Sequence, residues 1–299
     1  MKHILLSCFF FKNLTGSEIY YYELAKALIK LGYNVTIAAN VIGNGDLMSL
    51  ARKEGYDSKF NVQHISNIHS LKNYDLVICS HVPIVKHLTL IKSNENDTTP
   101  IISINHHEYY QLEQPIVTNL INKYIGIRPV ICKKLSDVYG IKNPQLVWNP
   151  FDFNRYPLKP IKEFDWNKKN TILYCGTIDC VRKESIYDCA DMCQNNGWKM
   201  LLVGTNHDHY LYDLLKKYNC IEYHEATNDI EQYVNQSDAT AGVFIGRTTI
   251  EGWLCGIPGY VYLLDEKNHI ISKELQFPPD DREKFDEDVV IKEILKGFE

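Results

Sequence analysis

Short apolar runs alternate with amphipathic stretches along most of the chain, and this alternation is the strongest constraint on its fold. Predicted strands lie at residues 3–10, 35–39, 76–79, 101–104, 146–148, 171–175, 200–203, 220–224, 240–244 and 260–264. Helical spacing of apolar residues predicts helices at 18–31, 84–91, 133–139, 185–194, 210–218, 230–236 and 249–255. Apolar strands separated by amphipathic helices are typical of parallel sheets covered on both faces. The expected fold class is therefore α/β.

Three prolines in residues 149–160 (Pro150, Pro157 and Pro160) interrupt this pattern near the middle of the chain. A chain of 299 residues is also long enough for two cores. We therefore expect two Rossmann-like domains, 1–155 and 156–299. Such a pair would place a ligand in the cleft outside the carboxyl ends of the strands.

Composition excludes several classes of protein. No apolar run approaches the roughly 20 residues needed to cross a bilayer. The apolar run 4–11 is interpreted as a buried strand rather than a signal sequence, since no small-residue cleavage site follows it. Up to residue 155 there are sixteen Lys and Arg against twelve Asp and Glu, and beyond it sixteen against twenty-five. This small basic excess does not indicate nucleic acid as a partner, although it is compatible with an anionic acceptor or peripheral membrane contact.

The nine cysteines include no C-x-x-C pair and mostly fall in apolar runs, which favours reduced thiols in a cytoplasmic protein. Cys189 and Cys193 are four residues apart, but no second pair of ligands is near them, so no metal site is expected. No G-x-G-x-x-G follows the first strand and no P-loop motif occurs, which argues against NAD enzymes and P-loop NTPases. No cofactor is predicted.

Two segments of the second half carry residues suited to a diphosphate. Leu173-Tyr174-Cys175-Gly176-Thr177-Ile178 is followed by Val181-Arg182-Lys183, which puts two cations in a loop after a strand. Such a loop can neutralise a diphosphate leaving group. Residues 246–258 read G-R-T-T-I-E-G-W-L-C-G-I-P. The amides of Thr248 and Thr249 there would begin a helix, which is a favourable site for an anion.

These segments, together with residues 147–152 (V-W-N-P-F-D) and 202–205 (L-V-G-T), resemble the retaining GT-B glycosyltransferases of family four. The resemblance covers most of the chain and implies that Arg182 and Lys183 bind the donor diphosphate. It also implies donor contacts at Gly176, Thr177, Gly204, Arg247, Thr248 and Thr249, and a bond from the ribose hydroxyls to Glu251. The family's E-x7-E pair lacks its first glutamate here, since the position eight residues before Glu251 is occupied by Val243. Thr248 and Glu251 also fit a capping box, which is the alternative interpretation.

The resemblance is thinner in the first half. Gly16 lies where the family has a glycine-rich loop, in a segment where Thr15 and Glu18 again fit a capping box. His106 matches a histidine that the family places near the reacting sugar. His107 is the alternative one residue on, and His81 is a third candidate at the end of another predicted strand.

The function implied by this resemblance is retaining transfer of a hexose from GDP-mannose or a UDP-hexose. The acceptor would be a glycan, a lipid or a protein-linked carbohydrate. No metal is needed if amides, Arg182 and Lys183 hold the diphosphate. Two alternatives remain, a nucleotide-sugar epimerase and a non-catalytic nucleotide-sugar-binding relative, the latter because of the missing glutamate.

Overall fold

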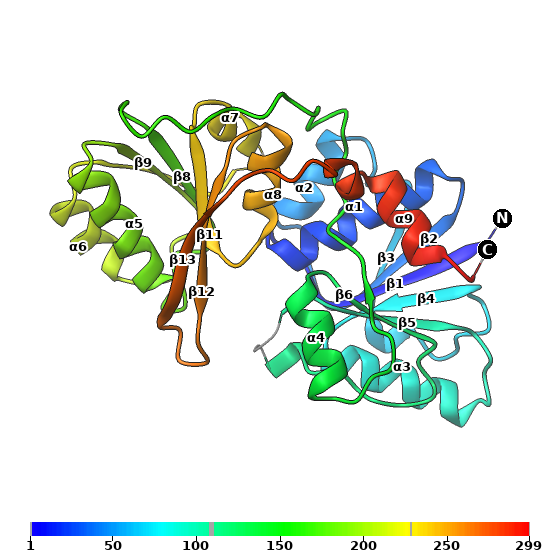
Figure 1. Ribbon diagram of the computed structural model, residues 1–299. Helices are drawn as coiled ribbons and strands as arrows, with labels where there is room; N and C mark the ends of the chain where they lie inside the picture. The colour runs from blue at the N-terminus through cyan, green and yellow to red at the C-terminus, as the bar shows by residue number, and fades with distance from the viewer. Residues whose placement is uncertain (1, 108–110, 228, 299) are drawn as a thin grey trace. The chain divides into compact units, whose positions relative to one another are not determined.

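The chain forms two compact α/β units, each with its own sheet (Figure 1). The computed structural model describes residues 2–107, 111–227 and 229–298. The first unit comprises Met1–Asp152 together with Lys284–Glu299, and the second comprises Phe153–Glu283. The α/β class with two parallel-sheet units, predicted from the alternation of strands and helices, is confirmed.

The first unit has a seven-stranded sheet in the order β3-β2-β1-β4-β5-β6-β7, and all of its pairings are parallel. Its strands are β1 (His3–Phe11), β2 (Asn34–Ile42), β3 (Asn61–His64), β4 (Leu76–Cys79), β5 (Ile101–Asn105), β6 (Lys123–Gly126) and β7 (Gln145–Leu146). Its helices are α1 (Gly16–Lys30), α2 (Asp46–Lys53), α3 (Val82–Asn94), α4 (Pro129–Asp137) and α9 (Glu287–Leu295). The short strands β3 and β6 and the helices α2 and α9 were not predicted.

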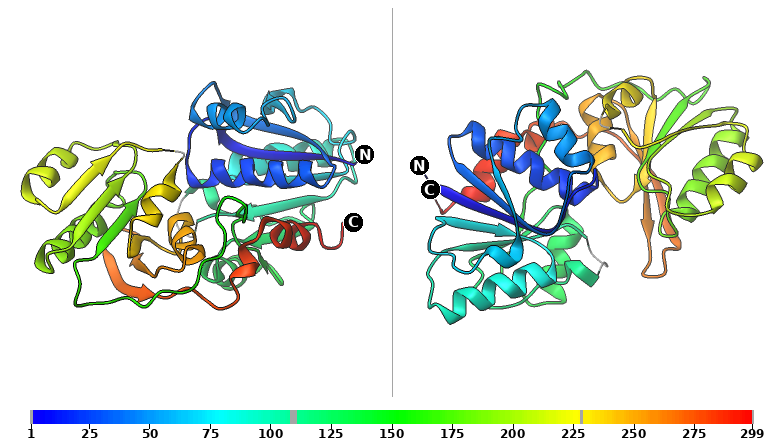
Figure 2. Two further views of the ribbon diagram at one scale, coloured as in Figure 1. Left: turned by 90° about the horizontal axis from the view of Figure 1, so that it is seen from above. Right: turned by 180° about the vertical axis from the view of Figure 1, so that it is seen from behind.

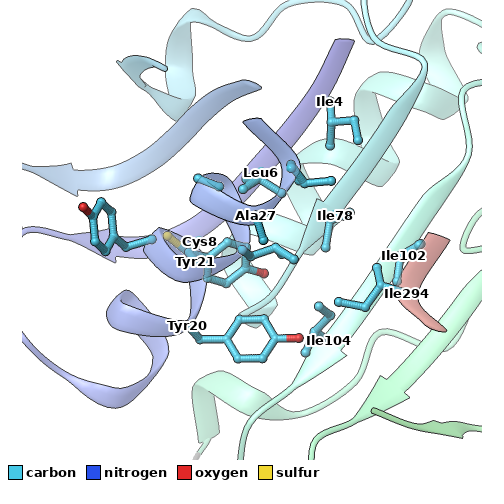
Figure 3. Close-up of a cluster of buried hydrophobic side chains, with 14 of the residues drawn as sticks. Ile4, Leu6, Cys8, Tyr20, Tyr21, Ala27, Ile78, Ile102, Ile104 and Ile294 are labelled. Carbon is cyan, nitrogen blue, oxygen red and sulfur yellow. The ribbon is translucent and has the colours of Figure 1, made fainter. Parts of the chain in front are cut away.

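Alternate residues of β1 point into different cores, as expected for a strand covered on both faces. Ile4, Leu6 and Cys8 belong to the cluster that includes α1, α2, α4 and α9. Leu5 belongs to the opposite cluster, which includes α3. Figure 3 shows the first cluster, in which Tyr20 and Tyr21 of α1 lie among isoleucines of β4 and β5.

The second unit has a six-stranded sheet in the order β10-β9-β8-β11-β12-β13, in which only the edge strand β13 is antiparallel. Its strands are β8 (Thr171–Cys175), β9 (Lys199–Val203), β10 (Ile221–His224), β11 (Ala239–Val243), β12 (Gly259–Leu264) and β13 (Ile270–Gln276). Its helices are α5 (Lys183–Asn195), α6 (Tyr210–Lys217), α7 (Ile230–Asn235) and α8 (Arg247–Leu254). Within each unit, helices lie on both sides of the sheet (Figure 2). The strand β13 was not predicted.

The last helix belongs to the first unit, whereas the sequence had assigned residues 156–299 to the second domain. Four apolar residues of α9 (Val290, Ile291, Ile294 and Leu295) are buried in the core that contains α1. Asp286 caps the helix by accepting a bond from the Asp288 amide at 2.8 Å. Glu287 is 5% exposed and accepts a hydrogen bond from Lys30 of α1, so this acidic residue forms part of the buried contact between the two helices.

Packing of α9 leads to a first prediction. Ile294 is fully buried, so Ile294→Ala should lower the free energy of unfolding by about 2–5 kcal/mol, because it leaves a cavity. Val289 lies on the same helix but is 40% exposed, and Val289→Ala should change that free energy by no more than about 0.5 kcal/mol. Urea unfolding would measure both. Equal effects of the two variants would contradict the docking of α9.

Candidate active site

The carboxyl ends of β4 and β5 bring two of the candidate histidines together in the first unit. Parallel strands end at the same edge of a sheet, so residues that directly follow neighbouring strands lie close together. His81 lies just beyond β4, after Ser80, and His106 directly follows β5. Their ring centroids are 6.3 Å apart and their planes are inclined by only 25°.

Glu113, which sequence reasoning did not single out, connects the two histidines. Its Oε1 lies 3.1 Å from His81 Nε2, and its Oε2 accepts the His106 backbone N–H at 3.0 Å. Its backbone carbonyl accepts a bond from Asn105 Nδ2 at 2.6 Å. His81 Nδ1 in turn accepts the Phe9 N–H at 3.2 Å, so the proton of the neutral ring is assigned to Nε2, which donates it to Glu113.

Glu113 and His81 are buried, and the Glu113 carboxylate stays ionised. Burial raises the pKa of Glu113, but the hydrogen bond from His81 and the other donors outweigh it, so the pKa lies below its usual range. His81 is 6% exposed and has φ of +70°, a conformation that costs a non-glycine residue free energy. Both ring nitrogens of His81 are occupied by these contacts, so the ring is a fixed support.

His106 differs from His81 because its Nε2 is buried and has no hydrogen-bond partner among the described residues. Its ring packs edge-on against Tyr20 at a centroid distance of 4.8 Å. Burial lowers the pKa of His106 to about 4, and the positive charge of Arg128 acts in the same direction. The ring is therefore neutral at pH 7 and poorly suited to take up a proton.

His107 lines a small pocket in the first unit, together with Asn105, Glu113, Lys134 and Tyr139. The structure thus places all three candidate histidines at the edge where β4 and β5 end. It assigns them different surroundings, and the choice between His106 and His107 as a sugar contact remains a prediction.

Gly16 begins α1 at the carboxyl edge of the same sheet, but the predicted capping box is not formed there. The Thr15 side chain caps no backbone amide; its hydroxyl donates to Glu18 Oε2 at 2.5 Å. Glu18 Oε1 instead accepts the N–H groups of Lys12 and Asn13, at 2.8 and 2.9 Å. Glu18 therefore braces the loop before the helix. A side chain added at Gly16 would meet no atom within 4 Å, so the space beside it is open.

In the second unit, β8 and β9 end in two glycines that touch through their backbones. Gly176 N–H donates to the Val203 carbonyl at 3.0 Å. A Cβ added to Gly204 would lie 1.8 Å from the carbonyl oxygen of Gly176, so only glycine fits at 204. Thr177, which follows Gly176, is half-buried. This close approach places the loop that carries Thr177 at the carboxyl edge of the sheet.

Arg182 and Lys183 lie at the start of α5 but have different environments. Arg182 precedes the helix, and Asp179 accepts both its amide at 3.0 Å and its Nη1 at 2.5 Å. A Cβ at Gly176 would lie 3.4 Å from Arg182 Nε, so the guanidinium stem runs beside that glycine. Lys183 is exposed and its Nζ lies 5.4 Å from the ring centroid of Tyr210. Asp179, which sequence reasoning missed, offsets the unfavourable position of a cation at a helix start.

Helix α8 begins two residues earlier than a capping box of Thr248 and Glu251 would require. Gly246 is its N-cap and Arg247 its first residue, so Thr248 cannot cap the helix and the predicted box with Glu251 is wrong. Phe244, just before this turn, has φ of +59°. Thr248 is half-buried and Thr249 is buried at 2% exposure. The N-cap residue, Gly246, has no side chain with which to bond the first amides of the helix.

Glu251 is 3% exposed, and the described residues donate hydrogen bonds to one of its two carboxylate oxygens. Oε1 accepts Arg247 Nε at 3.0 Å and the Tyr156 hydroxyl at 3.1 Å. Oε2 accepts no hydrogen bond from the residues that the structure describes. Burial raises the pKa of Glu251, and the charge of Arg247 and the bond from Tyr156 oppose that shift. A buried carboxylate with an open oxygen is costly unless a donor reaches it.

The arrangement of metal-ligating side chains and the character of the helices also bear on the chemistry. Within residues 2–107, 111–227 and 229–298, no three or more His, Cys, Asp or Glu side chains are grouped so that they could hold a metal ion. In the same part of the chain, none of the helices has the length and apolar character needed to cross a membrane. All nine cysteines are free, and Cys189 and Cys193 are both buried.

Comparison with known proteins finds similarity in structure alone. The chain matches no protein-family model and no curated protein. A structure of Anabaena Alr3699/HepE in complex with UDP-glucose is similar with a TM-score of 0.67 and 14% identity, over 87% of this chain and 80% of that chain. A glycosyltransferase from Rickettsia africae is similar with a TM-score of 0.66 and 12% identity, over 99% of this chain and 98% of that chain.

An alpha-glucosyltransferase in complex with UDP and a 13-mer DNA containing an HMU base is also similar, with a TM-score of 0.60 and 10% identity over 88% of this chain and 81% of that chain. At such identities the likeness establishes the fold. The chain has the GT-B fold of these glycosyltransferases. The assignment to family four and the retaining mechanism stay predictions.

The low pKa of His106 generates a prediction about pH and stability. The folded state disfavours protonation of His106 down to a pKa of about 4, whereas an unfolded histidine titrates near 6.5. The unfolded chain then binds more protons, so this contribution to stability is complete above about pH 6.5 and is lost as the pH falls toward 4. His106→Gln should make the free energy of unfolding less dependent on pH between 6.5 and 4. An unchanged pH dependence in urea unfolding would contradict the burial of this ring.

Proposed function

We propose that the protein is a retaining glycosyltransferase that moves a hexose from a nucleotide-sugar donor to a hydroxyl of a carbohydrate-containing acceptor. The observation that carries this proposal is the open oxygen of Glu251. Oε1 is fixed by Arg247 and Tyr156, while Oε2 is left without a partner among the described residues. Ribose hydroxyls are suitable donors for that oxygen, and a charged acceptor makes such bonds strong.

The surroundings of Glu251 suit the rest of a nucleoside diphosphate. The uncapped start of α8 offers the amides of Thr248 and Thr249, and a helix N-terminus favours an anion. Arg182 and Lys183, in the loop after β8, supply positive charge at the carboxyl edge of the same sheet. We propose that Gly176, Thr177, Gly204 and Arg247 complete the donor site, where glycine lets a ligand approach the backbone closely.

A UDP-hexose is the first donor to test. The similar structures include complexes with UDP and with UDP-glucose, which supports a uridine nucleotide for this chain as well. GDP-mannose remains the alternative donor that the family resemblance implies. The acceptor is proposed to be a glycan, a lipid or a protein-linked carbohydrate.

The first unit supports a mechanism without a protein base. Both ring nitrogens of His81 are occupied, and the low pKa of His106 makes that ring a weak proton acceptor. We propose that the donor's own phosphate oxygen takes the acceptor proton as the bond from the anomeric carbon to the leaving phosphate oxygen breaks. The acceptor oxygen then bonds to that carbon on the same face, which retains the configuration. His106 would orient the sugar through a hydrogen bond, and Gly16 would allow close approach of substrate to the start of α1.

The diphosphate assignment predicts strong effects from the two cations. Arg182→Ala and Lys183→Ala should each lower kcat/KM about 10²–10³-fold, because each removes a charge that stabilises the leaving diphosphate. Lys216→Ala is the control, since Lys216 lies on α6 over the ring of Tyr212 and should leave the rate unchanged. UDP release from UDP-glucose, with and without added acceptors, is the assay. Near-normal rates in both variants would overturn the diphosphate assignment.

The same assay separates the proposed enzyme from a non-catalytic binder through His106. His106→Ala should lower kcat much more than it weakens binding of free UDP, because the ring is proposed to contact the sugar and not the nucleotide. His107→Ala tests the adjacent position. A defect confined to His107→Ala would move the sugar contact by one residue, and the absence of a defect in both would remove the histidines from the mechanism. A wild-type protein that binds UDP but never releases it from any UDP-hexose would favour the binder.

A further inference from the structure

Tyr156 is a buried tyrosine whose hydroxyl meets the carboxylate proposed to bind ribose. It lies in the segment that leads from the start of the second unit to β8 and is 2% exposed. Its hydroxyl donates to Glu251 Oε1 at 3.1 Å. No sequence motif pointed to Tyr156, because the contact joins positions 95 residues apart.

The ring of Tyr156 is itself held in place by an ion pair. Arg155, its neighbour, pairs with Glu231 of α7 through two bonds, Nε to Oε1 at 2.9 Å and Nη2 to Oε2 at 3.0 Å. The Arg155 guanidinium carbon lies 5.3 Å from the centroid of the Tyr156 ring. A paired guanidinium against an aromatic ring restricts both side chains. The hydroxyl of Tyr156 is therefore presented to Glu251 from a rigid support.

The geometry at Glu251 shows what this contact does. Arg247 and Tyr156 both donate to Oε1, and a carboxylate with one oxygen fixed by two donors has a defined plane. Oε2 is then held in one orientation without using its lone pairs. An arrangement in which either donor bonded Oε2 instead would occupy the oxygen that the ribose hydroxyls need.

We infer that Tyr156 is a positioning residue of the donor site, which fixes the Glu251 carboxylate so that Oε2 is oriented toward the ribose hydroxyls. This inference rests on the proposed function of Glu251 as the ribose acceptor. The proposed role of Tyr156 is exerted through Glu251 and requires no contact of Tyr156 with the substrate. Its effect should therefore appear only with ligands whose sugar carries hydroxyls.

The test compares the binding of two nucleotides by calorimetry on the full chain. Tyr156→Phe keeps the ring and removes the hydroxyl. It should raise the dissociation constant for UDP about three- to tenfold, which corresponds to one net hydrogen bond. The same variant should bind 2′,3′-dideoxyuridine diphosphate as tightly as the wild-type protein does, since that nucleotide offers no ribose hydroxyl. Equal weakening of both nucleotides, or no weakening of UDP, would overturn the inference, because a packing role would not distinguish them.

Tyr218→Phe is the matched control. Tyr218 is 1% exposed and its hydroxyl donates to the carboxylate of Asp191 at 2.7 Å, but it lies before β10, away from the carboxyl edge. It loses the same kind of bond as Tyr156→Phe and should leave UDP affinity unchanged. If Tyr218→Phe weakened UDP binding as much as Tyr156→Phe does, the loss of any tyrosine–carboxylate bond would have that effect. This result would contradict the positioning role.

Glu251→Gln separates failure of this inference from failure of the proposed function. If Glu251 binds ribose, this variant should weaken the binding of UDP and leave the binding of the dideoxy nucleotide unchanged. Adding Tyr156→Phe to it should lower the affinity for UDP little further, because both changes act through one carboxylate. UDP affinity unchanged in Glu251→Gln would remove the ribose role of Glu251, and the inference with it. Loss of affinity in Glu251→Gln but not in Tyr156→Phe would leave the proposed function standing and reject the positioning role.

Discussion

Parallel strand pairing determines where chemistry can occur in this protein. All pairings of the first sheet, and all but the β12–β13 pair of the second, are parallel. Each strand of such a sheet therefore delivers its following loop to the same edge. The candidate residues after β4, β5, β8 and β11 lie at these edges for that reason. Helices on both faces also bury central strands such as β4, whose ends remain available to a ligand.

The residues that follow several strands have backbone conformations or close contacts that do not favour the stability of the fold. His81 and Phe244 have positive φ directly before α3 and in the turn before α8. Gly204 accommodates a backbone oxygen where any side chain would clash. Strained residues of this kind cost free energy and persist only where the surrounding structure fixes them. Their position at the same edges as the candidate site residues agrees with the proposal that these edges bind ligand.

Regular structure was well predicted wherever the hydrophobic period was strong. The bounds of β4 and β8 agree with the predicted 76–79 and 171–175, because both are continuous apolar runs between polar residues. The strand β13 was missed because an edge strand half exposed to solvent, with Ile271 66% exposed, lacks such a run. Helix α9 was missed because it begins among acidic residues, and the partner that neutralises Glu287 is Lys30, far away in sequence. Long-range pairing of this kind leaves no local signal.

The candidate site residues likewise include some that a local sequence motif indicated and others that it did not. Residues in local motifs, such as Arg182 with Lys183 and Thr248 with Glu251, could be selected from the sequence. Their partners Asp179 and Tyr156 could not, and neither could Glu113, which bonds His81 and His106. An isolated polar residue gives no indication of what it will meet. Both predicted capping boxes failed for a related reason. Glu18 and Glu251 found other donors, and in each case the bonds made in the folded protein replaced the expected local one.

The two buried glutamates illustrate how burial and bonding together assign a role. Glu113 uses both carboxylate oxygens and has a lowered pKa, so its charge is already satisfied within the first unit. Glu251 accepts bonds from the described residues through one oxygen and has a raised pKa, so its charge is stabilised less completely than in water. A ligand that donates hydrogen bonds has little to offer the first carboxylate and much to offer the second. Glu113 is thus suited to organise the histidines around it, and Glu251 to bind a sugar hydroxyl, although both are glutamates at the carboxyl edge of a parallel sheet.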